Sequence, residues 1–166
     1  MGVGKTTIGK KLAKKMEVSF TDSDEEIETA AGMSISDIFN EFGENYFREG
    51  EQRVMKRLLN EKPRIVASGG GAFISEEIRN LISRTSYSIW IRADLETIWG
   101  RLSEKNNRPL LLVEDPKKFL NCLIKERYPI YNEADITFDT TKSTSQIIFV
   151  KKILESLIKN KMVSIR

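Results

Sequence analysis

Histidine is absent from the 166 residues of this chain, and cysteine occurs once, as Cys122. Without histidine, imidazole acid–base catalysis and histidine metal sites are excluded, so any metal must bind oxygen ligands, which favours Mg²⁺. A single cysteine excludes a disulfide within the chain, and a reducing, cytoplasmic location is expected. No apolar run reaches 18 residues and the N-terminal MGVGKTT has no apolar core, so neither a membrane span nor a signal peptide is predicted.

Positive charge is only slightly in excess, since the chain has 27 lysines and arginines and 24 aspartates and glutamates. A net charge of +3 does not require a nucleic-acid partner, and none is predicted. Basic residues cluster once, on the first predicted helix, at Lys10, Lys11, Lys14 and Lys15. A solvated helix face explains this cluster better than a binding patch does. The length and a hydrophobic content of 40% suit one packed domain, which we expect to be a monomer.

Helical and extended patterns alternate along the chain. Strands are predicted over 18–21, 64–68, 86–91 and 135–138. Helices are predicted over 5–16, 24–31, 44–60, 76–82, 95–102, 116–128 and 146–158, with a capping box formed by Ser34 and Asp37. Strands separated by helices predict an α/β fold with a parallel sheet and helices on both faces, and ligands in such folds bind at the carboxyl ends of the strands.

The N-terminal residues GVGKTT match the end of the phosphate-binding pattern GxxxxGK[ST]. Glycines let backbone N–H groups close around phosphate oxygens, Lys5 would reach the β- and γ-phosphates, and the Thr6 hydroxyl would bind Mg²⁺. The first glycine of the pattern and the strand that normally feeds the loop would lie before Met1. Taken alone, the segment could also be a glycine turn that starts a basic helix.

Two acidic residues, Asp22 and Asp24, follow the first predicted strand. Carboxylates two residues apart at a strand end suit the water shell of Mg²⁺ and a substrate hydroxyl. Aspartate is also common at helix starts, so the pair taken alone is explained at least as simply by a helix N-cap.

Two arginines lie beside aromatic residues, Arg48 after Phe47 and Arg127 before Tyr128. A guanidinium fork suits a carboxylate, although an isolated arginine is most often surface charge. The turn Gly69–Gly71 ends a predicted strand, either because the backbone approaches a ligand closely there or because the loop is flexible.

The segment 105–113 is a polar loop long enough to be a lid. Arg108 within it would neutralise charge on a transferring phosphoryl group.

In chain order these segments resemble those of the shikimate kinase family. The matching residues are GVGKTT at 2–7, DSD at 22–24, FR at 47–48, GGG at 69–71, RPLL at 108–111 and RYPIY at 127–131. Their order and spacing cover nearly the whole chain, and the set is specific because gluconate and nucleoside kinases share the phosphate-binding loop but not this series. The one departure within these segments, Ile130 where the family usually has leucine, is conservative.

The resemblance implies ATP and shikimate as substrates and Mg²⁺ as cofactor. The ATP phosphates would be held by Gly2, Val3, Gly4, Lys5, Thr6 and Thr7. Thr6 would bind Mg²⁺ and Asp22 a water of its shell, and Arg108 would approach the phosphates when the lid closes. Ser143 aligns loosely with the family's adenine loop, and Arg101 would stack on adenine.

For the second substrate, the resemblance makes Asp24 the carboxylate that hydrogen-bonds shikimate hydroxyls and acts as base. Arg48 and Arg127 match the pair that clamps the shikimate carboxylate. The turn Gly69–Gly71 lies where backbone amides of the family meet a substrate hydroxyl, at Gly70. The implied reaction gives shikimate 3-phosphate and ADP, within aromatic amino-acid (chorismate) biosynthesis.

The fold that the resemblance implies is a three-layer α/β/α P-loop kinase fold. We expect a single kinase domain over 1–166, with a substrate-binding helical segment at about 23–60 and a lid at about 105–113. The family's sheet has five parallel strands, and its first, central strand would be missing here or lie before Met1. Loss of a central strand would leave its two neighbours unpaired.

Two alternatives stay open from the sequence. One is another small-molecule P-loop kinase, such as a gluconate kinase, against which the two arginines and the glycine turn argue. The other is a nucleotide-binding protein without catalysis, in which the incomplete phosphate-binding loop binds ATP but does not turn it over.

Overall fold

The structure is a computed structural model that describes residues 2–102, 114–160 and 162. These residues fall into two compact units, Gly9–Ser86 on one side and Met1–Ile8 with Tyr87–Arg166 on the other. Within the described ranges, no helix is long and apolar enough to cross a membrane.

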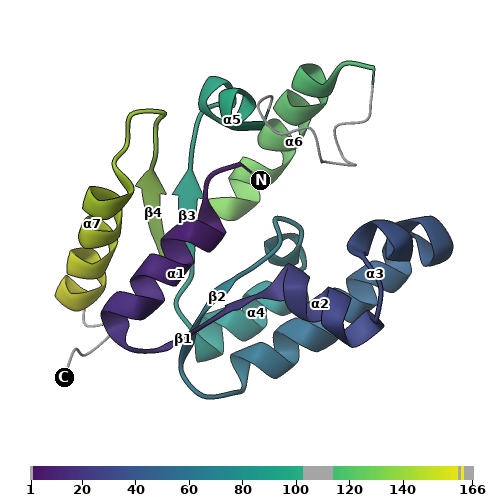
Figure 1. Cartoon of the computed structure of the whole chain (residues 1–166), viewed down its shortest axis with the longest axis horizontal. Coiled ribbons are helices and arrows are strands. Elements are labelled where there is room, and N and C mark those ends of the chain that lie inside the picture. The colour runs from purple at the N-terminus through teal and green to yellow at the C-terminus, as the bar shows by residue number, and fades with distance from the viewer. Residues whose placement is uncertain (1, 103–113, 161, 163–166) are drawn as a thin grey trace. The chain divides into compact units, whose positions relative to one another are not determined.

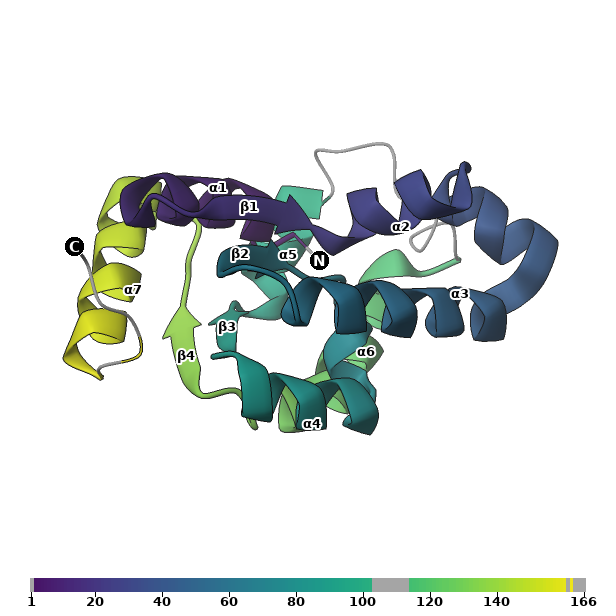
Figure 2. The ribbon, with the colours of Figure 1, turned by 90° about the horizontal axis from the view of Figure 1, so that it is seen from below.

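The unit Gly9–Ser86 contains a pair of parallel strands, β1 (Ser19–Asp22) and β2 (Arg64–Ala67). Ser19 lies opposite Arg64 and Asp22 opposite Ala67, so the carboxyl ends of both strands meet at one edge, as Figures 1 and 2 show. The remaining elements of this unit are α2 (Ser23–Ala31), α3 (Ile35–Leu59), the 3-10 turn η1 (Ala72–Ile74) and α4 (Glu76–Thr85).

Two apolar clusters hold this unit together. One joins α2 to α3 through Ile27, Ile38, Phe47, Val54 and Leu58. The other joins α3 to α4 and η1 through Met55, Ala72, Ile78 and Ile82. Apolar side chains of α3 recur at helical spacing, so neighbouring faces of one helix serve the two clusters.

The second unit contains the parallel strands β3 (Ile89–Arg92) and β4 (Ile136–Asp139). Arg92 lies opposite Asp139, and its Nε and Nη2 donate to the two carboxylate oxygens at 2.5 and 2.8 Å. The hydrogen bonds from Arg92 hold the pKa of Asp139 below its usual range. Both strands therefore end together, as in the first unit.

Four helices accompany these strands, α1 (Lys5–Met16), which continues into the other unit, α5 (Leu95–Leu102), α6 (Pro116–Tyr131) and α7 (Gln146–Lys159). Figure 1 shows α7 beside β4, where Phe149 packs edge-on against Phe138. A core of Val3, Ala93, Ile98, Leu102 and Leu120 joins the residues before α1 to α5 and α6.

The predicted order of helices and strands is confirmed, with ends shifted by three residues or more at four elements. Helix α4 ends at Thr85 rather than at Ile82. Helix α3 begins at Ile35 rather than near Glu44 and contains one non-helical residue, Gly43, with φ of 80°. Helix α6 continues past Pro129, because the proline sits in the last turn, where it removes a single helix hydrogen bond. Strand β3 begins at Ile89 rather than at Ser86, which is the C-cap residue of α4.

The four strands of the described ranges form two sheets of two strands, and none of them precedes α1. The α/β class and parallel pairing predicted from the sequence are confirmed. The sequence analysis expected the five-stranded sheet that the resemblance implies, with its central strand either missing here or lying before Met1. The predicted single domain over 1–166 stays a prediction.

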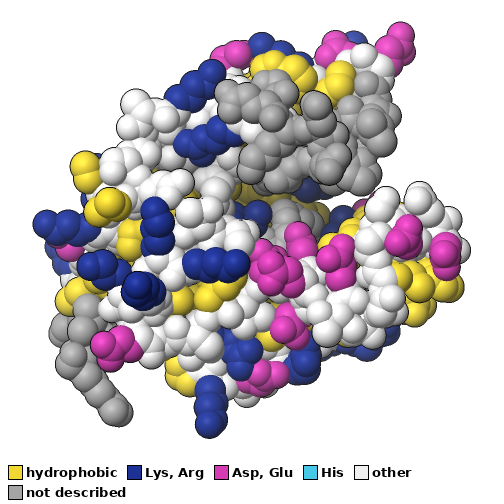
Figure 3. All heavy atoms as spheres, viewed as in Figure 1, with side chains coloured by type: hydrophobic (Ala, Val, Ile, Leu, Met, Phe, Trp, Pro, Cys, Tyr) yellow, Lys and Arg dark blue, Asp and Glu magenta, His cyan; other side chains and the backbone are white. Residues whose placement is uncertain are grey.

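Charged side chains gather on particular helices, as Figure 3 shows. The first turn of α2 is acidic, with Asp24, Glu25 and Glu26. The lysines of α1, at 10, 11, 14 and 15, are all exposed, which agrees with the predicted solvated face.

We predict that Ser23→Ala destabilises the fold by about 1–3 kcal/mol, because it leaves a backbone N–H without its acceptor. The Ser23 side chain is fully buried, and its Oγ accepts a hydrogen bond from the Gly69 N–H at 3.0 Å. The measurement is urea unfolding. Ser83→Ala, at an exposed position on α4, is the matched control and should stay within about 0.5 kcal/mol of wild type. Equal effects of the two changes would contradict the prediction.

Candidate active site

A cavity of about 460 Å³ surrounds the phosphate-binding loop. Gly2 and Gly4 have φ of 73° and 87°, a backbone region that glycine adopts without strain. Val3 between them is buried against α5. The loop then enters α1, whose first turn carries Lys5 and Thr6 into the lining of the cavity. Backbone N–H groups at a helix start beside a lysine make a phosphate site.

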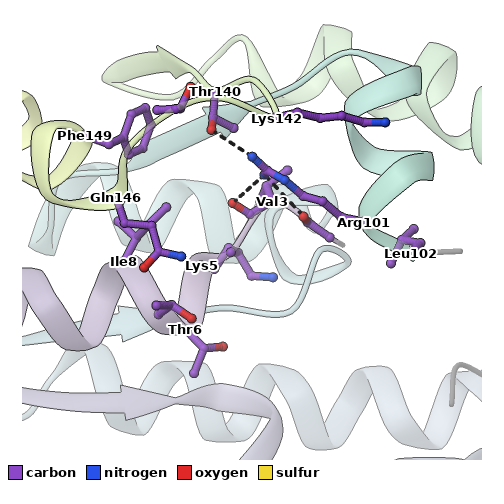
Figure 4. A pocket seen from close by; sticks show the side chains of 14 residues that line it. Val3, Lys5, Thr6, Ile8, Arg101, Leu102, Thr140, Lys142, Gln146 and Phe149 are labelled. Atoms are coloured by element: carbon purple, nitrogen blue, oxygen red, sulfur yellow. Dashed lines mark hydrogen bonds between the residues drawn. The ribbon is translucent and has the colours of Figure 1, made fainter. Parts of the chain in front are cut away.

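Arg101 of α5 ties this loop to the segment that follows β4. Its Nη1 lies 3.5 Å from the Gly2 carbonyl oxygen and 3.4 Å from that of Val3. Its Nη2 donates to Thr140 Oγ1 at 3.3 Å, and Figure 4 shows Arg101 between Val3 and Thr140. The same nitrogen donates to the Thr141 carbonyl oxygen at 2.6 Å. The edges of the guanidinium thus hold both walls of the cavity, a role that the sequence analysis did not predict.

The residues after β4 form the other wall. Thr140, Lys142, Thr144 and, on α7, Gln146 line the cavity. Ser143, predicted to contact adenine, lies between two lining residues, and its Oγ is 3.2 Å from Thr141 Oγ1. The predicted adenine contacts of Ser143 and Arg101 stay predictions.

The carboxyl ends of β1 and β2 bring a second group of predicted residues together. Asp22 caps α2, accepting a hydrogen bond from the Asp24 N–H at 3.1 Å. The N-cap alternative is therefore confirmed for Asp22, whose predicted Mg²⁺ role stays a prediction. A Cβ atom at Gly69 would lie 2.7 Å from Asp24 Oδ1, so the turn packs against this carboxylate.

The same turn packs against Arg48 of α3. A Cβ atom at Gly71 would collide with the Arg48 guanidinium, so a side chain there would displace the arginine. Arg48 Nη1 donates to Glu51 Oε2 at 2.7 Å, and Nε and Nη2 donate to Glu44 Oε1 at 3.2 and 3.0 Å. Burial disfavours the charge of Arg48, but these carboxylates outweigh it and raise its pKa.

Glu51 is the functional residue that the sequence analysis missed. Its side chain is 2% exposed, and its Oε1 would lie 3.3 Å from a Cβ atom at Gly69. A buried carboxylate needs a charged partner, and Arg48 supplies one. Its spacing from Arg48, three positions along a predicted helix, was the signal that could have revealed it.

Arg127, the other predicted clamp residue, lies on α6. Its Nε is buried and has no hydrogen-bond partner in the described part of the chain. Its neighbour Tyr128 fixes this helix by donating to the Ala93 carbonyl oxygen and packing edge-on against Trp90 at 4.8 Å. Burial raises the pKa of the Tyr128 hydroxyl. An unsatisfied buried guanidinium nitrogen is costly, and a ligand carboxylate would satisfy it.

The predicted lid at 105–113, with Arg108, lies outside the described residues. Within the described ranges, no group of three or more aspartate, glutamate, cysteine or histidine residues could hold a metal ion.

One unit supplies a glycine loop and a lysine at the start of α1. The other unit supplies a carboxylate beside a guanidinium and a glycine turn. A family model for shikimate kinase matches residues 1–158. The chain belongs to the shikimate kinase family. Members of this family are phosphotransferases with an alcohol group as acceptor, and the family predicted from the sequence is confirmed.

Relatives and solved structures agree with this membership. Shikimate kinase of Caulobacter vibrioides is 47% identical over 157 residues, which cover 95% of this chain and 78% of that protein. The relative from Bartonella henselae is 45% identical over 148 residues, covering 89% and 70%. The structure of Acinetobacter baumannii shikimate kinase in complex with shikimate has a TM-score of 0.91 at 36% identity, covering 98% of this chain and 91% of that one.

The fold extends to other P-loop kinases. A gluconokinase from Sinorhizobium meliloti has a TM-score of 0.56 at 14% identity, with coverage of 96% and 87%. This likeness shows the fold alone. The predicted P-loop kinase fold is confirmed by the shikimate kinase structures, and the chain shares its family with those rather than with the gluconokinase.

We predict that Arg101→Met weakens ATP binding by about tenfold, because each bond from a charged donor that positions the cavity walls is worth about 1.5–3 kcal/mol. Titration with ATP and Mg²⁺ measures the change. Arg84→Met, at an exposed arginine of α4, is the control and should bind as wild type does. If shikimate binding weakens as much as ATP binding, Arg101 supports the fold as a whole and not the cavity.

Proposed function

We propose that the chain transfers the γ-phosphate of ATP to the 3-hydroxyl of shikimate, giving shikimate 3-phosphate and ADP. The observation that carries this proposal is the Arg48 guanidinium held by buried Glu51 against the glycine turn, beside Asp24. A guanidinium binds a carboxylate, whereas a carboxylate and backbone N–H groups bind hydroxyls. These three groups therefore suit a small polyhydroxy carboxylate. The reaction would serve aromatic amino-acid biosynthesis.

The phosphate-binding loop would hold ATP. Backbone N–H groups from Gly2 to Thr7 would surround the phosphate oxygens, and the Lys5 ammonium would neutralise charge on the β- and γ-phosphates. Arg101 and, on the opposite wall, Lys142 add further cations to the lining. The polar, cationic lining fits a nucleotide phosphate chain better than a neutral ligand.

Mg²⁺ fits the oxygen donors present. Thr6 lines the cavity at the start of α1, where its hydroxyl would bind the ion, and Asp22 would hold a water of the ion's shell. When bound, Mg²⁺ would shield the phosphate charges during transfer.

Shikimate would bind through its carboxylate and its hydroxyls. Arg48 and Arg127 would take the carboxylate, which would satisfy the buried Arg127 Nε. The Gly70 backbone would contact a hydroxyl. Asp24 would orient the 3-hydroxyl for in-line attack and accept its proton as the new phosphate ester forms.

The remaining roles follow from the sequence. Arg108 would approach the phosphates as the lid at about 105–113 closes, stabilising the charge that develops on the oxygens. We propose a cytoplasmic monomer that uses neither a nucleic acid nor a membrane.

We predict that the purified chain releases ADP in a coupled assay with shikimate, ATP and Mg²⁺, and not with gluconate. Lys5→Met should lower turnover by at least about a hundredfold while the fold survives, since no backbone amide replaces the lysine charge. Circular dichroism checks the fold. Turnover of gluconate alone would overturn the substrate, and ATP binding without any turnover would favour a non-catalytic nucleotide-binding protein.

We predict that Arg48→Lys and Arg127→Lys each raise the KM for shikimate at least about tenfold, because an ammonium cannot make the planar fork to a carboxylate. Lysine is chosen at position 48 because alanine would leave buried Glu51 without a charged partner. The KM for ATP should change less than about twofold. Equal rises in both constants would assign these arginines to the nucleotide or to folding.

A further inference from the structure

Another cavity, of about 390 Å³, lies between α2 and α3 and takes no part in the proposed reaction. Its floor is made by the buried side chains of Ile27, Ile38 and Val54. Two aromatic residues, Tyr46 and Phe47, complete the wall, and Tyr46 is 47% exposed. A cavity of this volume with an apolar floor suits a small molecule with one ring.

The charged residues that line this cavity are both arginines, Arg53 and Arg57, and its described lining includes no carboxylate. Arg57 Nη2 lies 2.5 Å from Glu26 Oε2, so its charge is matched. Arg53 Nη1 forms an ion pair with Glu49 Oε2 at 3.9 Å, too long for a hydrogen bond, and the Arg53 side chain is 66% exposed. Arg53 therefore has donors for an anion at the edge of an apolar cavity.

Gly50 keeps the cavity open. It lies inside α3, where glycine is a poorer helix former than any residue except proline. A Cβ atom at this position would have Arg53 Nη2, at 3.9 Å, as its nearest neighbour, so packing does not require glycine here. The missing side chain leaves the space beside Arg53 unfilled.

We propose that this cavity binds a small aromatic monocarboxylate, with its ring on the apolar floor and its carboxylate on Arg53. The ring would contact Ile27, Ile38 and Tyr46, where offset stacking on the tyrosine adds to burial of apolar area. The carboxylate would accept the guanidinium fork of Arg53. This site is separate from the one that Arg48, Asp24 and the glycine turn form, and the proposal does not depend on the reaction.

The test is a titration of the ¹⁵N-labelled full chain with benzoate, followed by NMR, with saturating shikimate present. Benzoate should shift the amide signals of α2 and α3. Benzamide, which lacks the charge, and acetate, which lacks the ring, should each bind at least about tenfold more weakly.

Two variants test whether benzoate binds in this cavity. Gly50→Leu fills the cavity with a better helix former, so it should keep or raise the melting temperature while it abolishes benzoate binding. Arg53→Gln should weaken benzoate at least about tenfold, and Arg84→Gln, at an exposed arginine of α4, should not.

Several outcomes would overturn the proposal. They are no shift with benzoate, equal binding of benzamide, loss of the shifts when shikimate is added, and undiminished binding by Gly50→Leu. None of them concerns turnover, so the proposed reaction stands or falls separately.

Discussion

A single buried charge organises the substrate half of this protein. Glu51 is 2% exposed, and a carboxylate taken out of water must be paired or lose its charge. Arg48 pairs with it at 2.7 Å, which fixes the guanidinium against the turn that follows β2. The turn must then be glycine, because a Cβ atom at Gly71 would collide with the arginine. The arginine on α3 and the glycine in the turn after β2 thus follow from one desolvated carboxylate.

The parallel pairing of β1 and β2 supplies the rest of the constraint. Because Asp22 lies opposite Ala67, the start of α2 and the glycine turn leave the strands side by side. Ser23 joins them through its buried hydroxyl, and Asp24 lies one residue further on. The carboxylate proposed as base is therefore positioned by strand register and one hydrogen bond, and not by a flexible loop.

The sequence predicted the local features well and the long-range ones poorly. Helix and strand order, the Asp22 cap and the phosphate-binding loop depend on neighbouring residues, so periodicity and short patterns reveal them. Arg101 contacts residues about 40 and 100 positions away, and nothing in its surroundings indicates that its edges hold the loop of Gly2 and Val3. The sequence analysis did not single out Glu51, because its burial depends on the tertiary fold. The ends of α3 and α6 shifted because Gly43 and Pro129 interrupt a helix without ending it.

The two halves of the site differ in how sequence encodes them. The proposed phosphate site uses backbone N–H groups and one lysine from six consecutive residues, so a short pattern indicates it even where the pattern is incomplete. The proposed site for the second substrate uses side chains of α2 and α3 and the backbone of the turn after β2, which only the fold brings together. A gluconokinase shares the fold at a TM-score of 0.56 and 14% identity, so the fold leaves the substrate open. The substrate proposed for this chain rests instead on the placement of charge in residues 9–86, where buried Glu51 holds the Arg48 guanidinium against the glycine turn.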